Sequence, residues 1–141
     1  MREVHLDHTG VGGDNLGWIK KNPHLQWLVL GHNYLRDQDG KLCVLKSLAH
    51  ANRLIYLDLE NMLCDAEDMQ VLGTLPNLQY LFDVLVFSMN GRARWLQLLR
   101  KMQRLIGVRI SGMTSDHCAL SHKMERALPQ VDVDTAGLCT D

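Results

Sequence analysis

The hydrophobic positions of this chain recur at long, regular intervals. The segment that begins at Leu25 has its leucines and one asparagine, Asn33, at the spacing L-x-x-L-x-L-x-x-N-x-L. Segments that begin at Leu54, Leu78 and Leu105 repeat the first part of this spacing, at intervals of about 24 to 29 residues. Because the later two leucines of each segment flank a single residue, each segment predicts a short β-strand with one buried face.

Two further segments, near the ends of the chain, have a similar pattern. Residues 4–11 supply the same strand without its leading leucine, and residues 131–138 echo residues 4–11. The last repeat can be phased with Leu128 or with Val131 as its first position, and the echo favours Leu128. The pattern therefore predicts six strands.

The segments between the strands have apolar residues at helical spacing. We expect helices over 14–21, 41–50, 66–75, 92–103 and 116–127. Asp65 and Ser115 are candidate N-caps, because their side chains can accept hydrogen bonds from the first free backbone N–H groups. Pro23, Pro76 and Pro129 each follow a predicted helix, which proline cannot continue.

This combination of spacing, period and strand–helix alternation resembles the leucine-rich repeat superfamily, over nearly the whole chain. The full helices are typical of the longer intracellular class that includes ribonuclease inhibitor. The resemblance implies an α/β solenoid with short parallel strands on its concave face and helices on its convex face. We expect residues 1–141 to form a single array of about six strand–helix units.

Composition and charge narrow the functions that this array can have. The chain has 15 Lys and Arg against 16 Asp and Glu, a net charge of -1, so it lacks the basic excess of a nucleic-acid-binding protein. The longest apolar runs, such as 84–87, are too short to span a membrane, and the first residues do not resemble a signal peptide. The four cysteines form no C-x-x-C pair, which favours buried thiols. We expect a soluble, cytoplasmic protein with no membrane partner.

The residues between the strand leucines are the candidates for binding, because they point to the concave face. Residues two after the first leucine are Glu3, Trp27, Tyr56, Tyr80, Gly107 and Gln130. Residues between the later two leucines are His5, Val29, Asp58, Phe82, Arg109 and Asp132. Adjacent strands lie about 4.8 Å apart, so each series should form a ladder across the sheet. The expected partner-binding residues are Trp27, Tyr56, Asp58, Tyr80, Phe82 and Arg109, with Glu60 beside them. Cross-strand stacking that merely protects the sheet is the alternative.

Other candidate sites have weaker patterns. Asp83 stands where a buried leucine is expected, which predicts either a perturbed carboxylate or a bulge that turns it outward. His5, Asp7, His8 and His32 could bind zinc, but His5 and His8 have opposite parity on a strand, and exposed polar residues explain them as well. His117, Cys118 and His122 lack accompanying ligands. The basic stretch 92–104 is interpreted as a solvated outer face, with docking to an acidic partner as the alternative.

The sequence has no recognised catalytic motif, so we expect neither an enzyme nor a bound cofactor or metal. The leading hypothesis is a protein-binding module. Segments 78–83, 95–99 and 110–114 are faintly similar to the Zyg/Zer group of substrate receptors, which implies a cullin ubiquitin-ligase adaptor as partner. An enzyme inhibitor of the ribonuclease-inhibitor type is the alternative, but it would need an acidic concave face, and the predicted face is aromatic and mixed in charge. A third possibility is a structural fragment without caps, because the array starts in a strand almost at Met1.

Overall fold

The structure, a computed structural model, describes residues 1–11, 16–33, 47–64, 66–86, 96–110 and 117–134. Among these, the side chains at 61–64, 66–69, 83–86, 110, 117, 118 and 120 are left out of the description. The candidate N-caps Asp65 and Ser115, and most of the helix expected over 41–50, lie outside the described residues.

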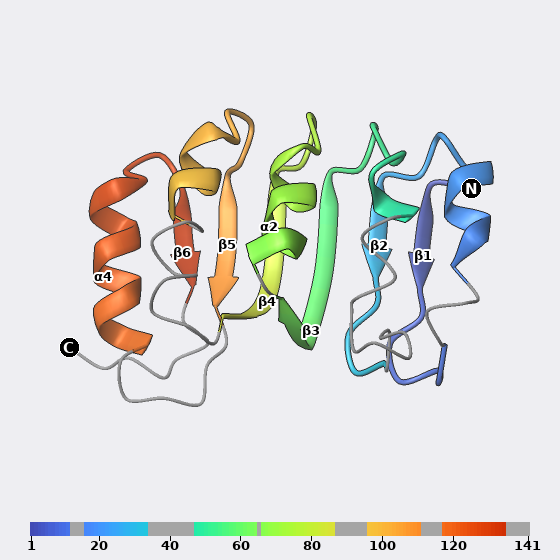
Figure 1. Cartoon of the computed structure of the whole chain (residues 1–141), viewed down its shortest axis with the longest axis horizontal. Helices are drawn as coiled ribbons and strands as arrows, with labels where there is room; N and C mark the ends of the chain where they lie inside the picture. The colour runs from blue at the N-terminus through green and yellow to red at the C-terminus, as the bar shows by residue number, and fades with distance from the viewer. Residues whose placement is uncertain (12–15, 34–46, 65, 87–95, 111–116, 135–141) are drawn as a thin grey trace.

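Six strands form one parallel sheet in which spatial order follows chain order (Figure 1). The strands are β1 (Glu3–His5), β2 (Trp27–Val29), β3 (Tyr56–Cys64), β4 (Tyr80–Val86), β5 (Gly107–Ile110) and β6 (Asp132–Asp134). Parallel neighbours need a crossover between them, and the predicted helical segments supply it. The six-stranded α/β arrangement predicted from the repeat pattern is therefore confirmed.

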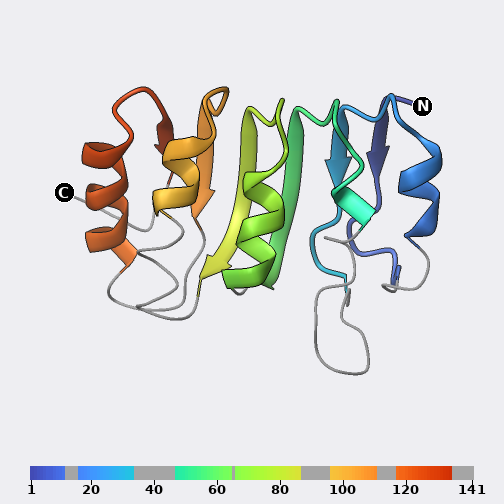
Figure 2. The same ribbon diagram turned by 45° about the horizontal axis from the view of Figure 1, so that its top comes forward.

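The described helices all lie on one side of this sheet (Figures 1 and 2). They include α2 (Ala66–Gly73) and α4 (His117–Ala127), together with a helical stretch over 96–101. The helix expected over 14–21 is instead a single 3₁₀ segment, η2 (Gly17–Lys21). It ends where Asn22 turns back, donating from its side chain to the Trp18 carbonyl and from its backbone N–H to the Ile19 carbonyl.

All three prolines lie in the turns that lead from a helix into the next strand, as predicted. No helix within the described residues is long and apolar enough to cross a membrane.

The core lies between the sheet and the helices, and the repeat leucines fill it. Leu28, Leu57, Leu81 and Val108 are in register on adjacent strands, and each is fully buried. The leading leucines Leu25, Leu54, Leu78 and Leu105 are also buried. Val4 and Val133 occupy the same row on the two outer strands but are only partly buried, because each outer strand has a neighbour on one side only.

The sheet is irregular where the sequence departs from the repeat pattern. Between β4 and β5 the register shifts in the interval from Leu81 to Val84, which contains Asp83. The bulge predicted from Asp83 is therefore present in the backbone; the direction of its side chain lies outside the description. A second shift follows Asp58 between β3 and β4.

The phase predicted for the last repeat is wrong. Asp132 pairs with Gly107 and Asp134 with Arg109, so these two aspartates, and not Gln130 and Asp132, continue the two series. Phasing on Leu128 places the strand two residues too early. Leu128 is buried in the turn, where the Val131 N–H donates to its carbonyl, just as the Leu105 N–H donates to the Met102 carbonyl. Val131 therefore makes the turn hydrogen bond of a leading leucine, but it lies directly before its strand residue Asp132, whereas Leu105 lies two residues before Gly107.

Asn33 ties the first two repeats together beyond the ends of β1 and β2. Its side-chain amide donates hydrogen bonds to the carbonyls of Leu6 and Leu30, and its side-chain oxygen accepts one from the Gly10 N–H at 2.9 Å. These groups have no strand partner there, so the asparagine satisfies polar backbone groups at the margin of the core.

Candidate functional site

The six residues predicted to bind a partner lie together on the sheet face that is turned away from the helices, here called the open sheet face. Trp27 pairs with Tyr56 and Tyr56 with Tyr80, while Asp58 pairs with Phe82. Each is offset by one residue from a buried leucine, and successive strand residues point to opposite faces. The alternation of the repeat therefore places all of these side chains on this face.

Four aromatic rings form a contiguous group, the aromatic ladder, made of Trp27, Tyr56, Tyr80 and Phe82. The Trp27 and Tyr56 rings stack with centroids 3.7 Å apart and planes within 2° of parallel. The Phe82 centroid lies 5.1 Å from that of Tyr56 and 6.2 Å from that of Tyr80. These separations are those of interacting aromatic pairs.

The ladder reaches no further than Tyr80 in its row because Gly107 follows it on β5. A Cβ atom at position 107 would approach Cδ1 of Tyr80 to 3.0 Å. The absence of a side chain at Gly107 thus leaves room for the Tyr80 ring beside β5. Glycine is needed at this position for packing and not for a turn conformation.

Arg109 closes the other end of the ladder. Its guanidinium carbon lies 5.1 Å from the centroid of Phe82, a cation–π distance, and its Nε donates to Oδ2 of Asp134 at 2.7 Å. The sequence pattern did not identify Asp134, because phasing on Leu128 placed Asp132 opposite Arg109. An Arg–Asp cross-strand pair could not choose between the phases, because the predicted phase also placed an aspartate, Asp132, opposite Arg109.

Asp58 lies half-buried at the centre of the open sheet face. Burial raises the pKa of its carboxyl above the ordinary value, and the neighbouring Glu60 and Asp7 carboxylates act in the same direction. The Glu60 backbone N–H, which donates to Asp58 Oδ1 at 2.9 Å, and the charge of Arg109 oppose this rise in pKa only in part. The charged form of the Asp58 carboxylate therefore lowers the free energy of unfolding.

Replacing Asp58 by asparagine is expected to stabilise the fold at pH 7. The asparagine oxygen can still accept the Glu60 N–H, whereas the desolvated charge is gone. Since the folded-state pKa of Asp58 is raised, the wild type loses stability as pH rises from the ordinary pKa of aspartate through the raised pKa, and the loss is complete above it. The gain of D58N, measured by urea denaturation, should shrink as pH falls toward the ordinary pKa of aspartate. Asp132→Asn, an exposed position on β6, is the control; an equal gain there would contradict the explanation.

The histidines at the other end of the sheet form a stack. His8 and His32 follow β1 and β2 with φ angles of 55° and 57°, and their ring centroids lie 4.0 Å apart. His8 and His32, two of the candidate zinc ligands, therefore lie side by side. Stacked imidazole rings do not place their nitrogens around a common metal position. The nitrogens contact carboxylates instead: His32 Nε2 lies 3.1 Å from Glu60 Oε2, and His5 Nε2 lies 2.6 Å from Glu3 Oε1. Within the described residues no three His, Cys, Asp or Glu side chains are placed to hold a metal ion.

Among the described side chains, opposite charges are distributed unevenly between the two sides of the sheet. The sheet strands and their ends carry two arginines, Arg2 and Arg109, against the carboxylates Glu3, Asp7, Asp58, Glu60, Asp132 and Asp134. The helices and the turns after them carry one carboxylate, Glu125, against Lys20, Lys21, Arg53, Arg100, Lys101, Arg104, Lys123 and Arg126.

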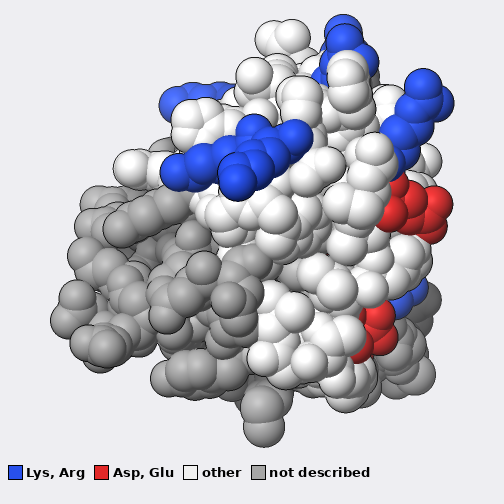
Figure 3. Space-filling view, turned by 90° about the vertical axis from the view of Figure 1, so that its right-hand side faces the viewer, with Lys and Arg blue, Asp and Glu red and all other residues white. Residues whose placement is uncertain are grey.

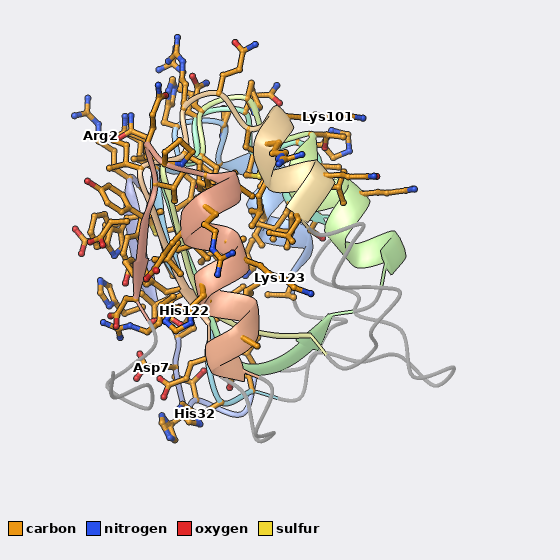
Figure 4. The ribbon with its side chains drawn as sticks, turned by 90° about the vertical axis from the view of Figure 1, so that its left-hand side faces the viewer. Arg2, Asp7, His32, Lys101, His122 and Lys123 are labelled. Atoms are coloured by element: carbon orange, nitrogen blue, oxygen red, sulfur yellow. The ribbon has the colours of Figure 1, made fainter. Side chains whose placement is uncertain are left out.

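The figures show the same separation. At the β1 end of the molecule, the acidic atoms lie on the sheet side, and basic atoms lie above them on that side as well as toward the helices (Figure 3). From the opposite end, Asp7 and Arg2 lie on the sheet side and Lys101 and Lys123 on the helix side (Figure 4). The open sheet face thus carries both signs of charge, and among its described side chains the carboxylates outnumber the arginines.

No protein-family model matches the sequence, and no curated protein matches it. Among solved structures, the actin-binding site 2 of leiomodin-1 superposes with a TM-score of 0.68 at 12% identity, over 92% of this chain and 80% of that one. An internalin C2 from Listeria monocytogenes has a TM-score of 0.49 at 16% identity, over 93% of this chain and 69% of that one. An internalin from the same organism, inlF, has a TM-score of 0.43 at 21% identity, over 66% of this chain and 30% of that one. At such low identity the leiomodin-1 likeness concerns the fold, and with the repeat pattern and the parallel sheet it shows that this chain folds as a leucine-rich repeat solenoid.

Proposed function

We propose that this chain is a protein-binding module whose contact surface is the aromatic ladder of the open sheet face. The observation that carries the proposal is the stacked, partly exposed ring system on a face opposite the described helices. Trp27 is 37% exposed and is one of three large hydrophobic residues, with Met1 and Ile106, that are exposed in the described chain. Leucine-rich repeat folds commonly present such a surface to other proteins.

Rigid aromatic side chains favour binding for a physical reason. Tryptophan and tyrosine bury a large area while losing few rotatable bonds, and they dominate the energetics of measured interfaces. Here the rings are already fixed by each other, with Trp27 flat against Tyr56. A partner would therefore meet a preorganised surface and would lose little binding energy to ordering it.

Two finer roles differ in the partner that they require. A substrate receptor of a cullin ubiquitin ligase rests on the sequence resemblance alone. An enzyme inhibitor of the ribonuclease-inhibitor type requires an acidic face, and the six carboxylates of the open sheet face support it. Recovery of adaptor and cullin subunits with the chain would favour the first role, whereas a single basic enzyme would favour the second.

The proposal is tested with the double variant Trp27→Ala and Tyr56→Ala. A partner that copurifies with the wild type should bind the variant at least about tenfold more weakly, because both stacked rings are removed. Ile106→Ala, which truncates an exposed apolar residue in the turn before β5, is the matched control and should leave binding unchanged.

Circular dichroism and urea denaturation establish that both variants are folded before binding is compared. If every partner remains bound to the folded double variant, the ladder serves to protect the sheet and the proposed surface is wrong.

A further inference from the structure

One face of the Trp27 ring is covered by a second ring, and the strand on its other side carries a carboxylate. Tyr56 on β3 stacks against the first face at 3.7 Å. The strand on the opposite side is β1, where Glu3 is the register partner of Trp27. Glu3 is exposed, with 62% of its side chain accessible, and contacts His5 further along the same strand. The end of the ladder thus consists of an exposed indole beside an exposed carboxylate.

The other end of the ladder shows how such a pair holds a cation. There the Arg109 guanidinium lies 5.1 Å from the centroid of Phe82 and is fixed by Asp134 on the adjacent outer strand. Trp27 and Glu3 likewise combine a ring with a carboxylate, but on the directly adjacent strands β2 and β1, so a cation would bind to them from outside the sheet and not from an intervening strand. Among the described residues, no Arg or Lys of this chain lies over the Trp27 ring.

We propose that the exposed Trp27 face and Glu3 bind an arginine side chain of a partner protein, with the guanidinium against the indole and paired with the carboxylate. The proposal rests on the proposed function, since it specifies what the open sheet face recognises. Indole is the strongest cation–π acceptor among the side chains, and arginine, being planar, can stack on it while it donates to a carboxylate. The Trp27–Glu3 pair is here called the arginine site.

The charge of the surrounding face selects a basic partner. The open sheet face and its margins hold the six carboxylates named above against two arginines, Arg109, which is paired with Asp134, and Arg2, which directly precedes β1. Complementary fields accelerate encounter and disfavour partners of the same sign. An acidic segment or a nucleic acid would be repelled here, whereas a segment with several arginines would be attracted before any ring contact forms.

The probe is a blocked Gly/Ser peptide with three arginines, compared with otherwise identical peptides in which lysine, citrulline or glutamate replaces arginine. Binding to the full chain is measured by NMR titration at low salt. We expect the arginine peptide to shift the indole N–H signal of Trp27, the lysine peptide to bind more weakly, and the citrulline and glutamate peptides not to bind. Trp27→Ala and Glu3→Gln should each weaken binding about two- to fivefold. Glu125→Gln on α4, an exposed carboxylate on the basic side, is the matched control and should have no effect.

Each contrary result would overturn the proposal. Absence of binding by the arginine peptide, equal binding by the citrulline peptide, or equal weakening by Glu3→Gln and Glu125→Gln would each exclude an arginine site at Trp27. These results are separable from failure of the proposed function. A natural partner that is lost with the Trp27 and Tyr56 double variant, yet is not displaced by the arginine peptide, would leave the binding module in place and remove only the arginine site.

Discussion

Replacing Leu57 by alanine is expected to lower the free energy of unfolding by about 2–5 kcal/mol. Leu57 is fully buried at the centre of the sheet, in register with Leu28 on one side and Leu81 on the other. Truncation removes apolar contacts and leaves a cavity that the neighbouring strands, held by their hydrogen bonds, can close only in part. In a solenoid each repeat packs only on its neighbours, so a defect at this position weakens the connection between the two halves of the array.

Urea denaturation followed by circular dichroism measures this effect. Ile106→Ala removes a similar amount of side chain from an exposed position and should change the free energy of unfolding by less than about 0.5 kcal/mol. Two separate transitions in the Leu57 variant would indicate that the halves unfold independently. A loss no larger than that of Ile106→Ala would contradict the placement of Leu57 in the core.

Replacing Asn33 by alanine is expected to destabilise the fold by about 1–3 kcal/mol. The carbonyls of Leu6 and Leu30 and the N–H of Gly10 would lose a hydrogen-bond partner at once. Because these groups lie where the chain leaves β1 and β2, the loss should be concentrated at the first two repeats. Native-state hydrogen exchange should then show faster exchange at Leu6 and His8, whose N–H groups bond the carbonyls of Val29 and Gly31.

Asn52→Ala is the control for this prediction, since Asn52 is an exposed asparagine in the turn before β3. It should change stability little and leave exchange in the first repeats unaltered. Equal destabilisation by the two substitutions would mean that the side-chain bonds of Asn33 contribute nothing beyond those of a surface residue.

The inward and outward positions of the strands could be predicted from the sequence because a fixed period leaves little choice. Once Leu25, Leu54, Leu78 and Leu105 are aligned, the two-residue alternation determines that Leu57 is buried and that Tyr56 lies on the open sheet face. Asn33 could likewise be recognised by its spacing from Leu30. These relations lie within one repeat, so the residue spacing alone predicts them.

Relations that depend on a missing residue could not be predicted in this way. The last repeat has no residue between Val131 and the strand residue Asp132, whereas the repeat before it has Ile106 between Leu105 and Gly107. A regular spacing therefore did not place Asp134 opposite Arg109, which it contacts at 2.7 Å. The 3₁₀ form of η2 depends on the turn at Asn22, whose side chain bonds the Trp18 carbonyl. The spacing of apolar residues does not predict this hydrogen bond. The net charge does not tell where individual charged side chains lie. The excess of carboxylates on the open sheet face therefore became evident only from the positions of the strands and helices.

The described acidic and basic side chains, most of which lie on opposite sides of the sheet, produce an electric dipole directed across this part of the molecule. A partner would then meet a field of different sign according to which of these sides it approaches. A charged partner would turn the molecule during approach, so that productive collisions outnumber those expected from random orientation. Added salt would weaken this alignment at distances beyond the Debye length, about 8 Å at physiological ionic strength, while leaving the stacked rings unaffected. Orientation and contact would therefore respond to ionic strength independently.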